Sequence, residues 1–284
     1  MPKIAIITDT DCSLPEDLAA RYCIQQVPIT VQFGEESFLT GVNIDDTALF
    51  QRVDHENKLP STAAPSPGQF LEAYEKAFAV GAEVVLCFAV SSAVSATYNN
   101  AVNARQLLPE RDITVIDTQS LSLGQGFMVM AAAEAAQRGA TPQACLTLAQ
   151  DVVQRTHLYA ALATLKYLAM SGRIGSLAAG MAGWLNIKPI LTIQDGKLEL
   201  LERIRTQKKA WSRVIDLITE AANGQPIERL GIVHVAAPQA AKEFEQQLRA
   251  SLDCPADMLV SDLTPGLSVH TGTGLVGAAI VVKP

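Results

Sequence analysis

The sequence predicts an α/β protein of two domains, with a mainly parallel sheet flanked by helices in the first domain and a mixed sheet in the second. Residues 84–90 are all apolar and indicate a buried strand, and the hydroxyl-rich residues 91–97 then begin a helix. Strand and helix patterns alternate through the first half, which favours parallel strands joined by crossover helices. In the second half, Asp195-Gly196 between two apolar segments predicts a β-hairpin, so that sheet contains antiparallel strands as well.

The chain begins with an apolar run at residues 3–8 that predicts the first strand. Ser13 is expected to cap a short helix at residues 15–22. Residues 30–33 and 37–40 predict a small hairpin outside the main sheet.

A capping box marks the next helix of the first half. Ser66 and Gln69 have the spacing of the box, and Pro67 stands at the first helical position. The helix is expected to end at Gly81. The strands and helices expected after it, in alternation, are residues 84–90, 95–108, 113–117 and 124–138.

Thr141-Pro142 predicts the last helix of the first domain, which ends before His157. We therefore divide the chain into a first domain of residues 1–156 and a second of residues 157–284. The segments expected in the second domain are an apolar run at residues 158–164, helices at 165–170 and 176–186, hairpin strands at 187–194 and 197–204, helices at 208–222 and 239–252, and strands at 230–235, 258–263 and 275–282.

Composition excludes several classes of protein. A net charge of −7 over 284 residues argues against a general nucleic-acid or anionic-membrane binder. The five cysteines are scattered and form no C-x-x-C pair, so reduced thiols are expected, with no disulfide framework and no zinc site. Asp9 comes too early for the apolar core of a signal peptide, and no apolar stretch approaches the roughly 20 residues that cross a bilayer. A cytoplasmic protein is expected.

Polar loops follow several of the expected strands. In an open parallel sheet such loops meet at the carboxyl edge, where ligands bind. Each loop alone has ordinary turn chemistry, and Ser95 alone has the position of a helix N-cap. Together they offer neutral donors to a carboxylate or phosphate that carries an apolar tail. The loops are residues 9–13, 60–67, 91–97 and 117–120.

The sequence supports a catalytic or a metal-binding site less well than a site for a carboxylate or phosphate. Asp9 and Asp11 could start a metal site, but no third ligand has a suitable spacing, and Asp9 is expected to order its own loop. Ser95, His270 and Asp9 could formally make a hydrolase triad, yet the G-x-S-x-G elbow is missing. His270 stands in a Gly/Thr-rich turn before an apolar strand, where backbone can approach a ligand closely. Arg173 lies between glycines and Arg205 just past a strand, which indicates a solvated basic edge or a docking surface for a phosphate or an acidic partner.

These motifs together resemble the DegV family, whose members are fatty-acid-binding proteins that serve as acyl-carrying subunits of bacterial fatty acid kinase. The resemblance covers essentially the whole chain. Its motifs are Thr8-Asp9-Thr10 with Leu14-Pro15, Ser61-Thr62-x-x-Pro65-Ser66-Pro67 with Phe70, Ser91-Ser92-x-x-Ser95-x-Thr97-Tyr98, Asp117-Thr118 with Ser122 and Gly124, Leu165-x-Tyr167-Leu168, Gly172-Arg173-Ile174, Lys188-Pro189-Ile190-Leu191 and His270-Thr271-Gly272.

The resemblance implies a non-catalytic protein that binds a long-chain fatty acid, with no other cofactor and no metal. The Ser/Thr loops of the first domain would hold the carboxylate, and the second domain would contribute the acyl pocket. Arg173 and Arg205 match positions linked to docking of a separate ATP-binding kinase subunit, which would phosphorylate the carboxylate. The residues expected at the carboxylate are Thr62, Ser92, Ser95, Ala96, His270 and Thr271.

The chain departs from the family pattern at three positions. Ala96 stands where glycine is usual, and its methyl group would narrow the approach to the carboxylate. Ser171 replaces a common glycine and Thr273 a common proline.

The main alternative function is that of an enzyme subunit of the dihydroxyacetone-kinase type. Such a subunit would bind a small hydroxyketone through His270. A long apolar cavity favours the fatty acid and a small polar one the hydroxyketone.

Overall fold

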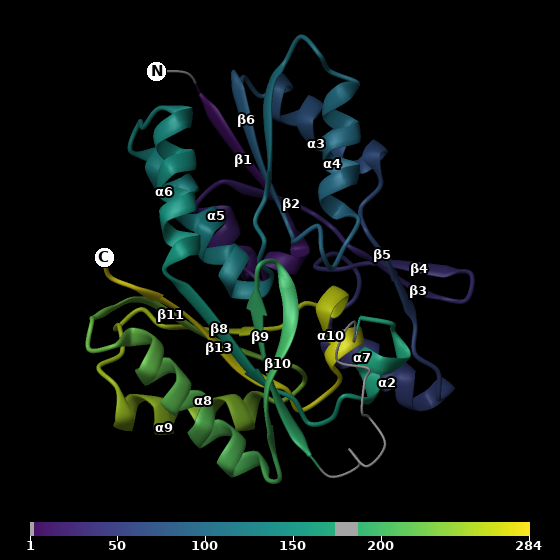
Figure 1. Cartoon of the computed structure of the whole chain (residues 1–284). Coiled ribbons are helices and arrows are strands. Elements are labelled where there is room, and N and C mark those ends of the chain that lie inside the picture. The colour runs from purple at the N-terminus through teal and green to yellow at the C-terminus, as the bar shows by residue number, and fades with distance from the viewer. Residues whose placement is uncertain (1–2, 174–186) are drawn as a thin grey trace.

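The computed structural model describes residues 3–173 and 187–284, so the helix expected at residues 176–186 lies outside the described residues. The chain forms two α/β halves, one above the other in Figure 1. The first half is built on a four-stranded sheet in which every neighbouring pair is parallel, as predicted. Its strands, in the order in which they pair, are β2 (Ile24–Val27), β1 (Ile4–Asp9), β6 (Val84–Ala89) and β7 (Asp112–Asp117).

Helices cover both faces of this sheet. On one face, α3 (Pro67–Ala79) and α4 (Thr97–Gln106) pack against β6, and Phe70 and Tyr74 of α3 are fully buried there. On the other face α5 (Ser122–Gln137) packs against β1 and β6, and α6 (Pro142–Gln154) packs on α5. All six residues of β6 are buried because both of its faces are covered, which confirms the strand predicted from its apolar run.

The helix starts predicted from the sequence are largely confirmed. The capping box at the start of α3 forms both of its bonds, since Gln69 N–H donates to Ser66 Oγ (3.3 Å) and Ser66 N–H donates to Gln69 Oε1 (2.9 Å). Thr141 caps α6. The Ser13 cap is wrong: α1 (Glu16–Arg21) starts from Pro15 without a side-chain cap, and Ser13 adopts a left-handed conformation (φ 53°) that ends the 3₁₀ helix η1 (Thr10–Cys12).

The predicted hairpin is confirmed and belongs to a separate three-stranded sheet. β3 (Thr30–Phe33) pairs antiparallel with β4 (Glu36–Leu39) on one side and with β5 (Ser61–Ala63) on the other. The sequence indicated only a loop where β5 lies, because three residues show no periodicity. The helix α2 (Asp46–Glu56), which has Asp45 as its N-cap, was also missed.

The second half contains a six-stranded mixed sheet, and the Asp195-Gly196 hairpin is confirmed within it. β9 and β10 are antiparallel, and both turn residues have positive φ (49° and 76°). Of the described strand pairs in this sheet, only β11 and β12 are parallel. The strands, in the order in which they pair, are β10 (Lys197–Ile204), β9 (Lys188–Gln194), β8 (Thr156–Ala161), β13 (Val276–Val282), β11 (Ile227–His234) and β12 (Leu259–Asp262).

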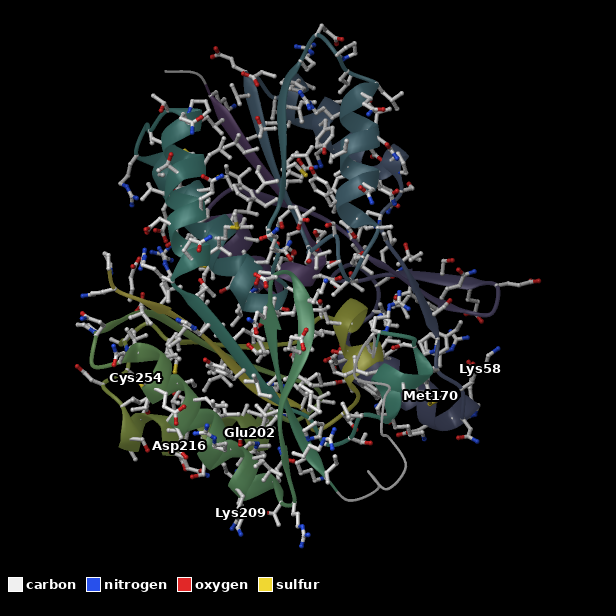
Figure 2. All side chains as sticks on the ribbon, in the orientation of Figure 1. Lys58, Met170, Glu202, Lys209, Asp216 and Cys254 are labelled. Atoms are coloured by element: carbon white, nitrogen blue, oxygen red, sulfur yellow. The ribbon has the colours of Figure 1, made fainter. Side chains whose placement is uncertain are left out.

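Two amphipathic helices cover the outer face of this sheet. α8 (Gln207–Ala222) and α9 (Pro238–Ser251) bury one stripe each against it, including Trp211 and Ile218 of α8 and Phe244 of α9. The polar side of α8 faces outward, where Figure 2 shows Lys209 and Asp216 pointing away from the sheet. The inner face is left for contact with the first half.

Helix α5 joins the two halves. It contacts β1 and β6 of the first sheet and β8, β11 and β13 of the second, and thirteen of its sixteen residues are buried. A helix that is apolar on all sides belongs in such an interior position. A partly buried ion pair crosses this contact, with Arg229 Nη2 of β11 2.7 Å from Glu134 Oε2 of α5. We propose that the two domains divide where β8 begins, close to residue 156.

Gly126 of α5 provides a test of this packing. A Cβ atom there would lie 2.7 Å from the backbone oxygen of Cys12 and 3.0 Å from Leu14 Cδ2, and the backbone atom cannot rotate away. Gly126→Ala is therefore expected to lower the free energy of unfolding by about 1–3 kcal/mol, measured by urea denaturation.

Gly68→Ala in α3 is the matched control. A Cβ atom there would meet only Ser66 Oγ, at an ordinary 3.7 Å. Its stability is expected to stay level or rise by up to about 1 kcal/mol, because alanine has the higher helix propensity. Equal effects of the two substitutions would contradict the tight packing of α5.

Candidate functional site

A cavity of about 530 Å³ lies between the two halves. Its walls come from the loops at the carboxyl edge of the first sheet, from β5, and from the inner face of the second sheet together with α10 (Pro265–Thr271). Its volume is within the usual range for small-molecule sites, about 300–1,000 Å³. The strand ends of β1, β6 and β7 therefore meet a ligand-sized space, as the sequence predicted for this edge.

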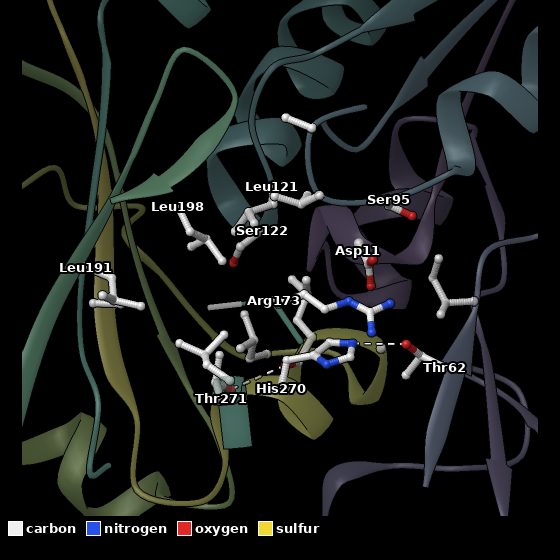
Figure 3. A pocket seen from close by; sticks show the side chains of 18 of the residues that line it. Asp11, Thr62, Ser95, Leu121, Ser122, Arg173, Leu191, Leu198, His270 and Thr271 are labelled. Atoms are coloured by element: carbon white, nitrogen blue, oxygen red, sulfur yellow. Dashed lines mark hydrogen bonds between the residues drawn. The ribbon is translucent and has the colours of Figure 1, made fainter. Parts of the chain in front are cut away.

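One end of the cavity is apolar. Figure 3 shows Leu191 of β9 and Leu198 of β10 on the side away from the charged groups. The large aliphatic residues that line the cavity are Ile29, Val94, Leu121, Leu158, Leu162, Leu168, Leu191, Leu198, Val233, Leu263, Leu267 and Leu275.

The β9–β10 hairpin forms one wall and is fastened to the first half at its tip. Ser91 Oγ donates a hydrogen bond to the backbone oxygen of Gly196 (2.7 Å), and both groups are buried from solvent. A side chain on Gly196 would meet Ser91 Oγ at 2.6 Å and the backbone of Gln119 at 3.5 Å. Two features of this turn therefore require glycine at position 196: its positive φ and its close approach to Ser91 and Gln119.

The other end of the cavity is polar, and its central contact joins the two halves. Thr62 Oγ1 and His270 Nε2 share a hydrogen bond of 2.9 Å. Thr62 lies in β5 and His270 in the last turn of α10, so the loop and turn expected for them are both corrected. Burial, and then the positive charge of Arg173, lower the pKa of His270 to about 4, so the imidazole is neutral near pH 7. Neutral imidazole has one N–H to donate.

The turn at residues 91–97 follows β6 and is anchored by two carboxylates at the ends of β1 and β7, the strands on either side of β6. Asp9 Oδ2 accepts a hydrogen bond from Val90 N–H (2.7 Å), and its Oδ1 accepts one from Asp11 N–H (3.0 Å), so Asp9 orders its own loop as expected. Asp117 accepts bonds from the backbone N–H (3.2 Å) and the hydroxyl (2.5 Å) of Ser92. These contacts fix the turn before any ligand arrives.

Ser95 is not the N-cap of α4. The N-cap is Ala96, in a right-handed helical conformation (φ −76°, ψ −2°), so Ser95 lies one residue earlier. Its Oγ accepts a bond from Thr97 N–H (3.3 Å) and pairs with Thr97 Oγ1 (2.8 Å). Ser92, Ser95 and Ala96 all line the cavity, so this turn forms part of its wall.

The two predicted docking arginines have different positions. Arg173 lines the cavity, and Figure 3 shows its guanidinium between Asp11, His270 and Thr62. Arg205 is exposed beyond the end of β10 and does not line the cavity. Thr271 does line it and donates its hydroxyl within α10 to Leu267 O (3.3 Å).

Two buried polar groups in the cavity wall were not predicted as site residues. Asp11 was weighed only as part of a metal pair, and Ser122, at the start of α5, was not considered as a ligand contact. Among the described residues, Asp11 Oδ1, Ser122 Oγ and His270 Nδ1 are buried and have no hydrogen-bond partner. The only signal in the sequence was their position after the strand ends, which they share with ordinary turn residues.

The arrangement does not assemble a hydrolase triad from the expected residues. Ser95 pairs with Thr97, His270 with Thr62, and Asp9 with backbone and with Gln125. In residues 3–173 and 187–284 no group of three or more His, Cys, Asp or Glu side chains could hold a metal ion. Within the same part of the chain, no helix has the length and apolar character to cross a membrane.

Comparisons with known proteins give one consistent result. The model of the family described as "Uncharacterised protein, DegV family" matches residues 3–283. A DegV domain-containing protein of Halalkalibacterium halodurans is 31% identical over 283 residues and covers 100% of both chains. One from Streptomyces coelicolor is 32% identical over 277 residues and covers 98% of each chain.

Two solved structures are similar over the full length. The first, described as fatty acid binding of a DegV family protein from Thermus thermophilus, has a TM-score of 0.92 at 32% identity and covers 100% of both chains. The second, DegV from Bacillus subtilis, described as a fatty acid binding protein, has a TM-score of 0.89 at 27% identity and also covers 100% of both chains.

Proposed function

This chain belongs to the DegV family, and from that premise we propose that it binds a long-chain fatty acid in the cavity between its two halves. The observation that carries the proposal is a single cavity with an aliphatic end and a hydroxyl-rich end. Two relatives of known structure are described as binding fatty acids, which supports the same ligand class here. The carboxylate would lie at the polar end and the acyl chain among the leucines.

The carboxylate would be held by neutral donors. Thr62, Ser92, Ser95 and Ala96 line the cavity; the hydroxyls of Thr62 and Ser95 and the backbone near Ala96 would supply the donors, while the Ser92 hydroxyl donates to Asp117 and holds the turn in place. Thr271 lines the same end. Hydrogen bonds from neutral donors to an ionised carboxylate are worth about 1.5–3 kcal/mol each and bring no second buried charge that would have to be desolvated.

The shape of the cavity favours this ligand over a small hydroxyketone. The leucine-lined walls of β8, β9 and β10 extend well beyond the space that a hydroxyketone of three carbons would fill. Burying an alkyl chain there contributes about 0.8 kcal/mol for each CH₂ group. The apolar end would be left largely empty in the dihydroxyacetone-kinase type of function.

We further propose that the chain performs no chemistry alone and presents its fatty acid to a separate ATP-dependent kinase subunit. There a carboxylate oxygen would attack the γ-phosphorus of ATP, the bond to the ADP oxygen would break, and acyl phosphate would form. Arg205 is exposed, and Arg173 is exposed and also lines the cavity, so both can contact a partner. Dependence on ATP favours a cytoplasmic location.

Protein purified gently is expected to carry an acyl ligand. Denaturing extraction followed by mass spectrometry identifies it, and delipidated protein should regain thermal stability when palmitate is added, by about 2.7 kcal/mol at a hundred-fold excess over Kd. Several preparations that contain no acyl ligand and gain no stability from palmitate would rule out the proposed function.

Thr62→Ala combined with Ser95→Ala is expected to weaken fatty-acid binding by about 3 kcal/mol or more, since two charge-assisted hydrogen bonds are lost. Calorimetric titration with palmitate measures the change. Thr147→Ala combined with Ser251→Ala removes the same two hydroxyl types from exposed helix positions away from the cavity and should leave Kd unchanged. Equal affinity of the two double variants would remove Thr62 and Ser95 from the site.

Arg205→Glu is expected to reduce acyl phosphate formation about ten-fold or more, which is at least about 1.4 kcal/mol, when the ATP-binding subunit of a bacterial fatty acid kinase is limiting. Palmitate affinity should not change, because Arg205 does not line the cavity. Lys242→Glu, an equal charge reversal at an exposed position of α9, is the control. The same rate in both variants would contradict docking through Arg205.

A further inference from the structure

Asp11 places a second carboxyl group at the polar end of the cavity. It lies in η1, its side chain lines the cavity, and only 5% of the residue is exposed. Its Oδ1 atom has no hydrogen-bond partner among the described residues. Figure 3 shows Asp11 below Ser95 and above Arg173, on the side where the ligand carboxylate would lie.

The carboxyl group of Asp11 lies closely against the start of α10. Its backbone N–H donates to Asp9 Oδ1 (3.0 Å), which fixes the loop. Gly266 of α10 lies directly against Asp11 Oδ1, where the Cβ atom of any other residue would collide with it. The same Cβ atom would be 3.0 Å from Ile29 Cγ2. The carboxyl group is thus close to α10, on a loop that the bond to Asp9 holds in place.

The charges around Asp11 favour its neutral form. Burial, and then the negative charge of Asp9, raise the pKa of Asp11 well above its ordinary value, and the nearby Thr264 hydroxyl and then the charge of Arg173 oppose this only in part. His270 of α10 is neutral above about pH 4, because burial lowers its pKa, so it adds no positive charge near pH 7. Asp46 of α2, which accepts a bond from Ser268 of α10 (2.8 Å), is a further buried acid, and burial raises its pKa to about 8.

A fatty-acid carboxylate at this end would come to the same buried space as Asp11. Arg173 acts on both Asp11 and His270, which places all three groups at one end of the cavity. Two carboxyl groups that share a poorly solvated site cannot both ionise at little cost, so the pair keeps one proton. A proton between them also gives Asp11 an O–H that can donate to the ligand.

We propose that Asp11 determines the head-group specificity of the site: it is protonated in the complex, donates its O–H to the ligand carboxylate, and so binds a mono-anionic head together with one proton. The inference rests on the proposed function. As pH rises, the empty protein loses the Asp11 proton first while the complex retains it. Binding then includes proton uptake and weakens with increasing pH.

Calorimetric titration with dodecanoate between pH 6 and 9 tests this with Asp11→Asn, which keeps the shape and a donor but cannot titrate. For the wild type, Kd should rise by up to about ten-fold per pH unit above the pKa of Asp11 in the empty protein. One proton should be taken up per ligand there, measured in buffers of different ionisation enthalpy. Asp11→Asn should bind with the wild-type Kd near pH 6 and lose both the slope and the proton uptake.

Asp46→Asn is the matched control, because it removes a neighbouring buried acid that does not line the cavity. It should keep the pH slope of the wild type, and thermal unfolding checks that both variants fold. Difference infrared spectra of the wild type with carboxyl-¹³C dodecanoate give a second measurement, in which a protonated-acid band of unlabelled carbon should accompany binding above neutral pH.

Two results would overturn the role of Asp11 and leave fatty-acid binding intact. One is that the wild type and Asp11→Asn show the same dependence of Kd on pH and the same proton uptake on binding dodecanoate. The other is that the protonated-acid infrared band shifts when the ligand carboxyl carbon is ¹³C. Failure of the wild type to bind dodecanoate or palmitate at any pH would instead overturn the proposed function, and this inference with it.

Discussion

The packing of α5 between the two sheets is the constraint on which the rest of the structure depends. Its apolar surface on every side requires a partner in each half, and Gly126 and Gly231 let Cys12 and the second sheet approach it closely. Because α5 starts at Ser122, directly after the β7 loop, its position also sets the distance between the loops of the first half and the leucine-lined face of the second. The cavity is the space that this spacing leaves.

At the polar end of the cavity, two carboxylates, Asp9 and Asp117, hold the loops in place without contacting a ligand themselves. Asp9 accepts a hydrogen bond from Val90 N–H directly before the 91–97 turn, and Asp117 accepts bonds from the backbone N–H and the hydroxyl of Ser92 within the turn. A carboxylate ligand would therefore meet donors that are already oriented, which reduces the ordering cost of binding. Such donors also make a second positive charge at the site unnecessary. This agrees with a neutral His270 beside Arg173.

The sequence predicted those parts of the fold that are encoded locally. The capping box of Ser66, the apolar run of β6 and the Asp195-Gly196 turn are signals of a few neighbouring residues, and the structure contains each of them. β5 and α10 were missed because they are three and seven residues long and are stabilised by partners distant in the chain. Thr62 and His270 line the cavity, although the elements that carry them were not predicted, and the proposed role of Asp11 depends on a neighbour 255 positions away, Gly266, that no local pattern indicates.

The three departures from the family pattern lie where the backbone accepts any residue. Ala96 and Ser171 have ordinary right-handed helical angles (φ −76° and −90°), so neither position requires the glycine common in the family. Thr273 is exposed between Gly272 and Gly274, which carry the positive φ values of that turn (77° and 82°). Because these three residues do not strain the backbone, we expect them to affect ligand binding and not folding. The methyl group of Ala96 is the one that lines the cavity, beside the hydroxyl of Ser95.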